Sequence, residues 1–215
     1  SVFVFLLRAF GIKCYVSMDG IDWNRTRWNY FARMYLKLTN LLAFKLCDKV
    51  IIDNDIVKAF YVNKFKRKIK VIYYGANIIH IKTKKILGRL GIKGNKYILF
   101  VGRLSKEKGV HYLIDAFEKI VTDIKLVIVG DDLFDKNWVK KLKSTDNKRI
   151  IFTGYMYGKG VDELMQNCLF YIQPSEVEGL SPVILRVMGM GKCVLSSDIP
   201  ENKFLVNNNG YLFKN

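Results

Sequence analysis

Residues 169–188 read LFYIQPSEVEGLSPVILRVM, and this stretch decides the fold class. The apolar residues up to Gln173 predict a buried strand, and Pro182 is typical of the first turn of a helix. Between the two lies a turn that carries Glu178 and Gly179. In an open α/β sheet, a strand end followed by a helix N-terminus is where a ligand binds. Backbone N–H groups there can hold phosphate oxygens, and Glu178 can hold hydroxyl groups.

The same alternation of short apolar strands and helices extends across the second half of the chain, which predicts a doubly wound, parallel α/β sheet. The expected strands are Tyr97–Val101, Lys125–Val129, Arg149–Phe152, Leu169–Gln173, Cys193–Ser196 and Tyr211–Phe213. The expected helices are Val110–Val121, Asn137–Leu142, Val161–Gln166, Pro182–Met190 and Glu201–Val206.

The first part of the chain follows a similar but shorter pattern. A helix to Phe10, a strand over Ile12–Ser17, a helix over about Arg25–Leu46, a strand over Lys49–Ile52, a helix over Asp55–Val62 and a strand over Lys70–Tyr73 are expected. A basic stretch punctuated by glycines, Gly75–Gly94, predicts a linker. We therefore divide the chain into a first domain (1–80), a linker (81–95) and a second domain (96–215).

The long helix of the first domain carries an apolar stripe at helical spacing, made of Phe31, Met34, Tyr35, Leu38, Leu41 and Leu42, with Lys45 as the polar member. Arg27, Arg33 and Lys37 mostly lie off this stripe. A helix that packs on a core and presents a basic outer face is the usual form of this pattern. A helix that lies on a membrane surface is the alternative.

Charge is unevenly distributed along the chain. Of a net charge of +17, residues 1–95 contribute +14, from 19 Lys and Arg against 5 Asp and Glu. A basic half beside a nearly neutral half predicts a surface that faces anions such as lipid headgroups, an anionic polymer or nucleic acid. Solvated lysines are the alternative interpretation. The sequence carries no recognised nucleic-acid-reading motif, which argues against that partner.

The cysteines and histidines exclude several classes of protein. Four scattered cysteines without a C-x-x-C pair are typical of buried thiols in a reducing cytosol, and two histidines exclude a His-rich metal centre. The apolar segment Val2–Phe10 is shorter than the roughly 20 residues that span a bilayer. It also lacks the basic region and cleavage site of a signal peptide. We expect a cytoplasmic protein, with peripheral contact to the inner face of the membrane as one option.

Two further loops follow strand ends in the second domain. In Gly102–Gly109, Arg103 and Lys108 can both reach a diphosphate, because Arg matches the fork of a phosphate and Lys acts as a point charge. In Gly154-Tyr155-Met156, the main-chain edge can meet a nucleobase. Taken singly, such a basic loop is more often a solvated surface.

Together these segments resemble glycosyltransferase family 4 of the GT-B fold. The resemblance rests on FVGRLSKEKG, KLVIVGDD, IIFTGYMYGKGVDELMQNC and YIQPSEVEGLSPVILRVMGMGKCVLSSDIPEN. It implies two Rossmann-like doubly wound domains, the first of them incomplete here. Residues 15–77 are similar to a subgroup that includes bacterial rhamnosyltransferases, whose Asp-Gly-x-Glu-Trp-x-Arg segment corresponds to Asp19–Arg25.

The resemblance implies a retaining, metal-independent transferase that moves a sugar from a UDP- or dTDP-sugar to a glycan or lipid-linked acceptor, without a cofactor. Arg103 and Lys108 would neutralise the donor diphosphate, and Glu178 would hold the hydroxyls of the donor sugar. The amides of Gly179, Leu180 and Ser181 would add a phosphate site. Gly102, Gly154 and Tyr155 would lie against the nucleotide. Asp19 is a second catalytic candidate, with a turn-forming role as the alternative, and a helix cap is the alternative for Glu178.

One residue departs from the family pattern. The position of the second glutamate of the Glu-x7-Glu motif, which grips the nucleotide ribose in the family, is Arg186. A guanidinium donates hydrogen bonds but accepts none, so donor binding should weaken by roughly 1.5–3 kcal/mol per lost bond. The resemblance also implies that the chain is truncated at both ends, without the family's first strands and its closing helices. Arg186 and these expected truncations favour a second hypothesis, a non-catalytic remnant that binds a nucleotide or a partner.

Overall fold

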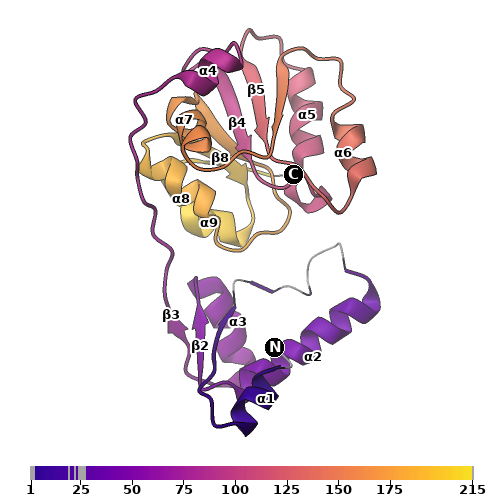
Figure 1. Cartoon of the computed structure of the whole chain (residues 1–215), viewed down its shortest axis with the longest axis vertical. Coiled ribbons are helices and arrows are strands. Elements are labelled where there is room, and N and C mark those ends of the chain that lie inside the picture. The colour runs from indigo at the N-terminus through magenta and orange to yellow at the C-terminus, as the bar shows by residue number, and fades with distance from the viewer. Residues whose placement is uncertain (1–2, 19, 22, 24–27, 215) are drawn as a thin grey trace. The chain divides into compact units, whose positions relative to one another are not determined.

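The computed structural model describes residues 3–18, 20, 21, 23 and 28–214 and divides into two compact units (Figure 1). The first consists mainly of residues before Gly75, and the second of most residues from Gly75 onward. Each unit has its own sheet and its own hydrophobic core.

The second unit is built on six parallel strands in the order β6-β5-β4-β7-β8-β9. Their bounds are β4 Tyr97–Val101, β5 Lys125–Val129, β6 Ile150–Gly154, β7 Phe170–Gln173, β8 Cys193–Ser197 and β9 Tyr211–Phe213. The chain adds strands on one side of β4 and then returns to add the rest on the other side. The loops after β4 and β7 therefore flank the switch point of the sheet, the position where α/β folds bind ligands.

Helices cover both faces of this sheet, as Figure 1 shows. One face packs against α5 (Val110–Glu118) and α6 (Lys136–Leu142), and the other against α4 (Lys85–Arg89), α7 (Lys159–Asn167), α8 (Pro182–Gly189) and α9 (Pro200–Val206). Side chains of β4 alternate between the two cores, with Tyr97 and Leu99 in one and Ile98 and Phe100 in the other. This double burial explains the continuous apolar runs of the strands.

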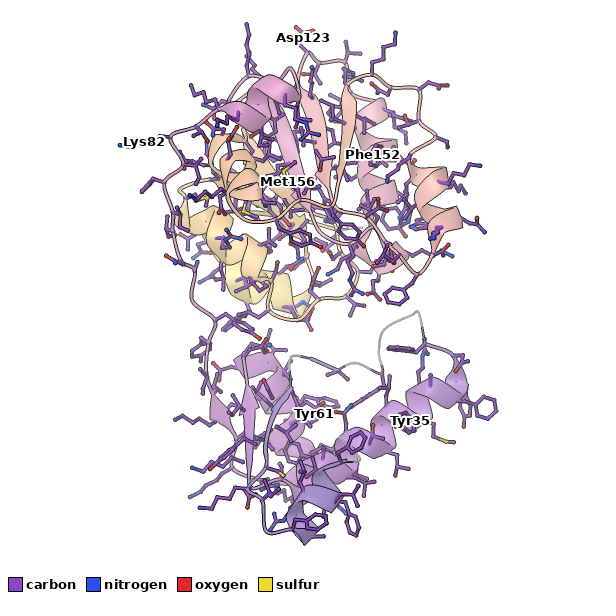
Figure 2. All side chains as sticks on the ribbon, in the orientation of Figure 1. Tyr35, Tyr61, Lys82, Asp123, Phe152 and Met156 are labelled. Carbon is purple, nitrogen blue, oxygen red and sulfur yellow. The ribbon has the colours of Figure 1, made fainter. Side chains whose placement is uncertain are left out.

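The first unit contains α1 (Phe3–Ala9), β1 (Tyr15–Met18), α2 (Tyr30–Leu46), β2 (Lys49–Ile52), α3 (Asp55–Phe65) and β3 (Lys70–Val71). Its strands are parallel in the order β1-β2-β3. Stacked aromatic rings hold its core together: the ring of Phe44 lies 5.4 Å from that of Tyr61 and 4.5 Å from that of Phe65. Tyr61, labelled in Figure 2, is fully buried.

The interpretation of α2 as a helix whose apolar stripe faces the core is wrong. The stripe residues Phe31, Met34, Tyr35, Leu38 and Leu42 are 74, 55, 61, 55 and 39% exposed. The buried residues of α2 are instead Thr39, Ala43 and Phe44, which lie near its C-terminal end. Helical periodicity shows that a helix has an apolar face, but it does not show what covers that face. No helix of the described residues is long and apolar enough to cross a membrane.

The segment 81–95, predicted as a linker, contains α4 and packs as part of the second unit. The Glu163 carboxylate on α7 accepts hydrogen bonds from the backbone N–H groups of Ile86 (2.7 Å) and Leu87 (3.0 Å). The side chain of Gln166 pairs with both backbone groups of Ile81. These contacts depend on residues some 80 positions apart, so the local sequence gave no sign of them. The roles of the predicted domains stay predictions.

Candidate nucleotide-sugar site at the switch point of the second sheet

The loops after β4 and β7 are joined directly. The backbone N–H of Glu176 donates to the carbonyl oxygen of Glu107 at 2.9 Å. Gly109 also lies against the second loop: it adopts φ +66°, and a Cβ at this position would lie 2.0 Å from the carbonyl oxygen of Pro174. Only glycine fits both the backbone conformation and the space, so Gly109 fixes the distance between the two loops.

The ends of β4, β5 and β6 form a continuous main-chain edge beside these loops. The N–H of Gly102 donates to Val129 at 3.0 Å, and that of Gly130 donates to Gly154 at 2.9 Å. A Cβ on Gly130 would lie 1.8 Å from the carbonyl oxygen of Gly102. The structure thus brings Gly102 and Gly154, both predicted nucleotide-site residues, to one edge of the sheet. Gly130, which holds them together, was missed, although its place at the end of an apolar strand could have indicated it.

Arg103 and Lys108 both lie in the β4–α5 loop, as predicted, and are half-buried. Lys108 ends a short 3-10 helix, Lys106–Lys108. The Arg103 guanidinium lies 3.7 Å from the carboxylate of Glu107, which is only 2% exposed. A buried carboxylate beside a partly exposed guanidinium restricts where the guanidinium can go. The loop therefore presents two cations at the carboxyl edge of the central strand.

Ser181 fixes the start of α8. Its Oγ accepts from the N–H of Ile184 at 3.4 Å and donates to Oε1 of Gln173 at 3.1 Å. The Tyr171 hydroxyl donates to the same Gln173 oxygen at 2.8 Å. Because Ser181 is the N-cap, the alternative reading of Glu178 as the cap of this helix is wrong. Glu178, Gly179 and Leu180 occupy the turn between β7 and α8, as the sequence predicted.

The turn after β7 is also held by α5. The Tyr112 hydroxyl donates to the Glu176 carboxylate at 2.8 Å, and this hydrogen bond raises the pKa of Tyr112 above its ordinary value. On the β6 side, the ring of Tyr155 is partly exposed and stacks on that of Tyr157, with centroids 6.1 Å apart and planes 8° apart. Burial and the nearby carboxylates of Asp131 and Asp132 raise the pKa of Tyr155.

Arg186 makes an ion pair that the sequence did not predict. Its guanidinium donates to the carboxylate of Asp162 in the first turn of α7. The Asp162 residue is only 2% exposed, and the Arg186 side chain is 32% exposed. Asp162 therefore balances the positive charge of Arg186. Two adjacent acids, Asp162 and Glu163, in a helix of otherwise apolar buried residues were the available signal.

Two further predictions concern Asp19 and the cysteines. Asp19 lies outside the described residues. Cys14, Cys47 and Cys168 are buried as expected, but Cys193 is exposed, because it begins β8 at the rim of the sheet. Within the described ranges, no group of three or more His, Cys, Asp or Glu side chains could hold a metal ion.

The sequence pattern of one known family matches most of the second unit. The family described as "Glycosyl transferases group 1" matches residues 82–215. The chain belongs to this family. Residues 2–77 match a second pattern, described as a domain of unknown function, DUF1972. The predicted glycosyltransferase family is thereby confirmed, whereas the rhamnosyltransferase-like subgroup stays a prediction.

Curated relatives of this glycosyltransferase-family chain include an uncharacterised glycosyltransferase of Methanocaldococcus jannaschii, 32% identical over 183 residues, covering 79% of this chain and 45% of that protein. Another is the N-acetylgalactosamine-N,N'-diacetylbacillosaminyl-diphospho-undecaprenol 4-alpha-N-acetylgalactosaminyltransferase of Campylobacter jejuni, 28% identical over 145 residues (67% of this chain, 38% of that protein). The chain thus spans less than half the length of these two relatives.

Solved glycosyltransferase structures share the fold. The Anabaena protein HepE, crystallised with UDP and glucose, matches with a TM-score of 0.85 at 22% identity, over 99% of this chain and 61% of that one. The predicted α/β GT-B fold is therefore confirmed.

Proposed function

We propose that this chain binds a nucleotide-diphosphate sugar, a UDP- or dTDP-sugar, and transfers the sugar to a polysaccharide or glycolipid acceptor. The observation that carries the proposal is the switch point of the second sheet. There the loop with Arg103 and Lys108 is bonded to the turn that opens α8. Two cations and a helix N-terminus at one strand edge suit a diphosphate. The UDP-bound relative HepE supports the choice of ligand class.

Each residue has a role in this proposal. Arg103 and Lys108 neutralise the diphosphate and stabilise the charge that develops on it as it leaves. The amides of Gly179, Leu180 and Ser181 bind phosphate oxygens at the start of α8. Because these groups supply the positive charge that a divalent cation would otherwise supply, the proposed reaction is metal-independent.

The proposed reaction retains the configuration of the sugar. The bond between the anomeric carbon and the phosphate oxygen breaks, and the acceptor hydroxyl forms the new bond on the same face. Its proton passes to an oxygen of the leaving phosphate. Glu178 accepts hydrogen bonds from hydroxyls of the donor sugar and so holds the reacting carbon in place. Asp19 is kept as a second catalytic candidate on the resemblance alone.

On the nucleotide side we assign the main-chain edge at Gly102 and Gly154, the ring of Tyr155, and Arg186. Gly102, Gly154 and Tyr155 lie at or directly after strand ends of the second sheet, and Arg186 lies on α8, the helix that follows β7. The resemblance of the first domain to rhamnosyltransferases of polysaccharide synthesis supports a deoxysugar donor. The proposed reaction needs no cofactor, because the nucleotide-sugar is itself the activated substrate.

For the acceptor side we propose peripheral contact with an anionic membrane surface, at its cytoplasmic face. The exposed apolar stripe of α2 is accompanied by Arg33 and Lys37, and an amphipathic basic helix of this type binds lipid interfaces. The undecaprenol in the name of the Campylobacter relative supports a lipid-linked acceptor.

Calorimetric titration with UDP, UDP-sugars and dTDP-sugars tests donor binding. Lys108→Ala should weaken binding about tenfold, in line with a lost charge-assisted hydrogen bond. Lys106→Ala is the matched control: Lys106 lies in the same 3-10 helix, but its Nζ is 5.3 Å from the centre of the Trp138 ring. Equal effects of the two substitutions would refute the assigned diphosphate site. If none of these nucleotides binds, the donor proposal fails.

A second function, binding of a nucleotide or partner without transfer, is favoured by Arg186 at the position of the family's second glutamate. Release of free nucleotide from a bound donor, measured with and without membrane extract as a source of acceptor, separates the two functions. Acceptor-dependent release supports transfer. Binding without such release supports the second function.

Vesicle co-sedimentation tests the membrane contact. The chain should bind vesicles containing phosphatidylglycerol, and Arg33→Glu/Lys37→Glu should lower this binding. Lys140→Glu/Lys141→Glu on α6 makes the same change of charge in the second unit. If both double variants lose binding equally, overall charge rather than α2 is responsible.

A further inference from the structure

The ion pair between Asp162 and Arg186 joins two helix starts at the proposed nucleotide site. Asp162 lies in the first turn of α7, which follows β6, and Arg186 lies in the second turn of α8, which follows β7. A side chain on a helix leans toward the helix N-terminus. The guanidinium of Arg186 therefore extends toward the carboxyl edge of the sheet, on the same side as the turn at Ser181.

Asp162 fixes the guanidinium rather than merely lying near it. A carboxylate that is 2% exposed needs a partner, because an isolated charge in the interior is strongly unfavourable. The guanidinium has five N–H donors, and one of its nitrogens is engaged by Asp162. With 32% of the Arg186 side chain exposed, donors remain for a ligand. The pair is thus an oriented donor group without net charge.

An ion pair of this kind should distinguish ribose from 2′-deoxyribose less strongly than a lone carboxylate does. A lone carboxylate that accepts from both ribose hydroxyls is left incompletely hydrogen-bonded when one hydroxyl is removed, so it discriminates against 2′-deoxyribose. In the Asp162–Arg186 pair, the carboxylate already has its partner. The exposed guanidinium donors can turn to water, so loss of the 2′-hydroxyl leaves no buried group unsatisfied.

We propose that the Asp162–Arg186 pair makes the nucleotide site tolerant of 2′-deoxyribonucleoside diphosphates. Arg186 is the residue that contacts the nucleotide, and Asp162 is the positioning residue that holds it. This inference rests on the proposed donor site, and it names the class of donor: the site accepts deoxyribonucleotide and ribonucleotide sugars alike.

The ion pair also determines which substitutions can create a ribose-binding carboxylate at position 186. Arg186→Glu alone places a second carboxylate against buried Asp162, and like charges at this distance repel. This single substitution should therefore fail to create a ribose-binding carboxylate. Asp162→Asn/Arg186→Glu removes the conflict and leaves one carboxylate at position 186.

The test compares UDP with dUDP, which differ only in the 2′-hydroxyl, by calorimetry on the full chain. The unaltered chain should bind the two within about threefold of each other. Asp162→Asn/Arg186→Glu should prefer UDP by about tenfold or more, as expected for a bond to a charged group. Asp198→Asn/Lys203→Glu alters an exposed ion pair in the same unit and should leave the UDP to dUDP ratio unchanged.

A tenfold or greater preference of the unaltered chain for UDP would overturn the inference while leaving the donor proposal intact. The same ratio in the unaltered chain and in Asp162→Asn/Arg186→Glu would also overturn it. If that variant does not fold, Asp162→Asn/Arg186→Gln serves instead. This variant should weaken the binding of UDP and of dUDP by a similar factor. Unchanged affinity would show that the pair does not contact these nucleotides. If no form binds either nucleotide, both proposals fail.

Discussion

At Gly109 the geometry of the candidate site depends on the absence of a side chain. Gly109→Ala should destabilise the second unit by about 2 kcal/mol or more, because the added Cβ would meet the carbonyl oxygen of Pro174 in a backbone region that disfavours alanine. It should also lower donor affinity, since the two loops must separate. Chemical unfolding and calorimetry measure the two effects.

Gly91→Ala is the matched control for this substitution. Gly91 also has a positive φ, +58°, but apart from Gly91 itself and its chain neighbours no described atom lies within 4 Å of the position of an added Cβ. The cost there should be only about 1 kcal/mol, and donor affinity should not change. Equal effects at Gly91 and Gly109 would show that backbone conformation alone, not the approach of the loops, requires glycine.

His111 should make stability depend on pH. Burial lowers its pKa in the folded state, outweighing the nearby carboxylates of Glu176 and Asp115, which raise it. The unfolded chain therefore binds a proton more readily, and stability should fall as the pH drops through about 6.5 toward the lower folded-state pKa. His111→Gln should flatten this part of the profile of unfolding midpoint against pH. An unchanged profile in His111→Gln would contradict the assignment.

At the scale of elements, α4 depends on a carboxylate from another helix. Its N-cap residue, Lys84, has a side chain without an acceptor, and Glu163 of α7 binds the amides of Ile86 and Leu87 instead. Glu163→Ala should cost about 2–3 kcal/mol and speed hydrogen exchange at those two amides. Lys159→Ala, an exposed change on the same helix, should do neither. Unchanged exchange in Glu163→Ala would rule out the capping role.

The elements also show which part of the fold the sequence could predict. The strands β4, β5 and β9 have the predicted bounds. For β4 and β5 this is because residues buried on both faces form continuous apolar runs. The orientation of α2 and the existence of α4 were missed. Both depend on contacts between distant segments, which local periodicity does not encode.

The candidate site likewise has features that the sequence predicts and features that it does not. Its loops were predictable, because glycines and basic residues after strand ends mark the carboxyl edge of a parallel sheet. The pairing of Arg186 with Asp162 left only a weak signal, the two adjacent acids of α7, because Arg186 and Asp162 are 24 positions apart on different helices. The close approach of Gly130 to Gly102 depends likewise on the register of two strands.

At the scale of the whole molecule, the two units have separate cores, so a ligand of one need not stabilise the other. Most of the assigned residues of the donor site belong to the second unit: Gly102, Arg103, Lys108, Gly154, Tyr155, Ser181 and Arg186. UDP at about 100 times its dissociation constant should raise the free energy of unfolding of that unit by about 2.7 kcal/mol. Hydrogen exchange resolved by segment should show this protection around β4 to β9. Equal protection in α3 and β2 would contradict the assignment.

The exposure of Cys193 allows the natural chain to be labelled at one chosen place. Burial raises the pKa of Cys168 to about 12, so its thiol stays protonated near neutral pH, and Cys14 and Cys47 are buried as well. A maleimide dye should therefore react first at Cys193. That residue begins β8, at the sheet edge opposite the strand ends that carry the candidate site. A fluorophore placed there would label this chain without a substitution and without obstructing the loops proposed to bind the donor.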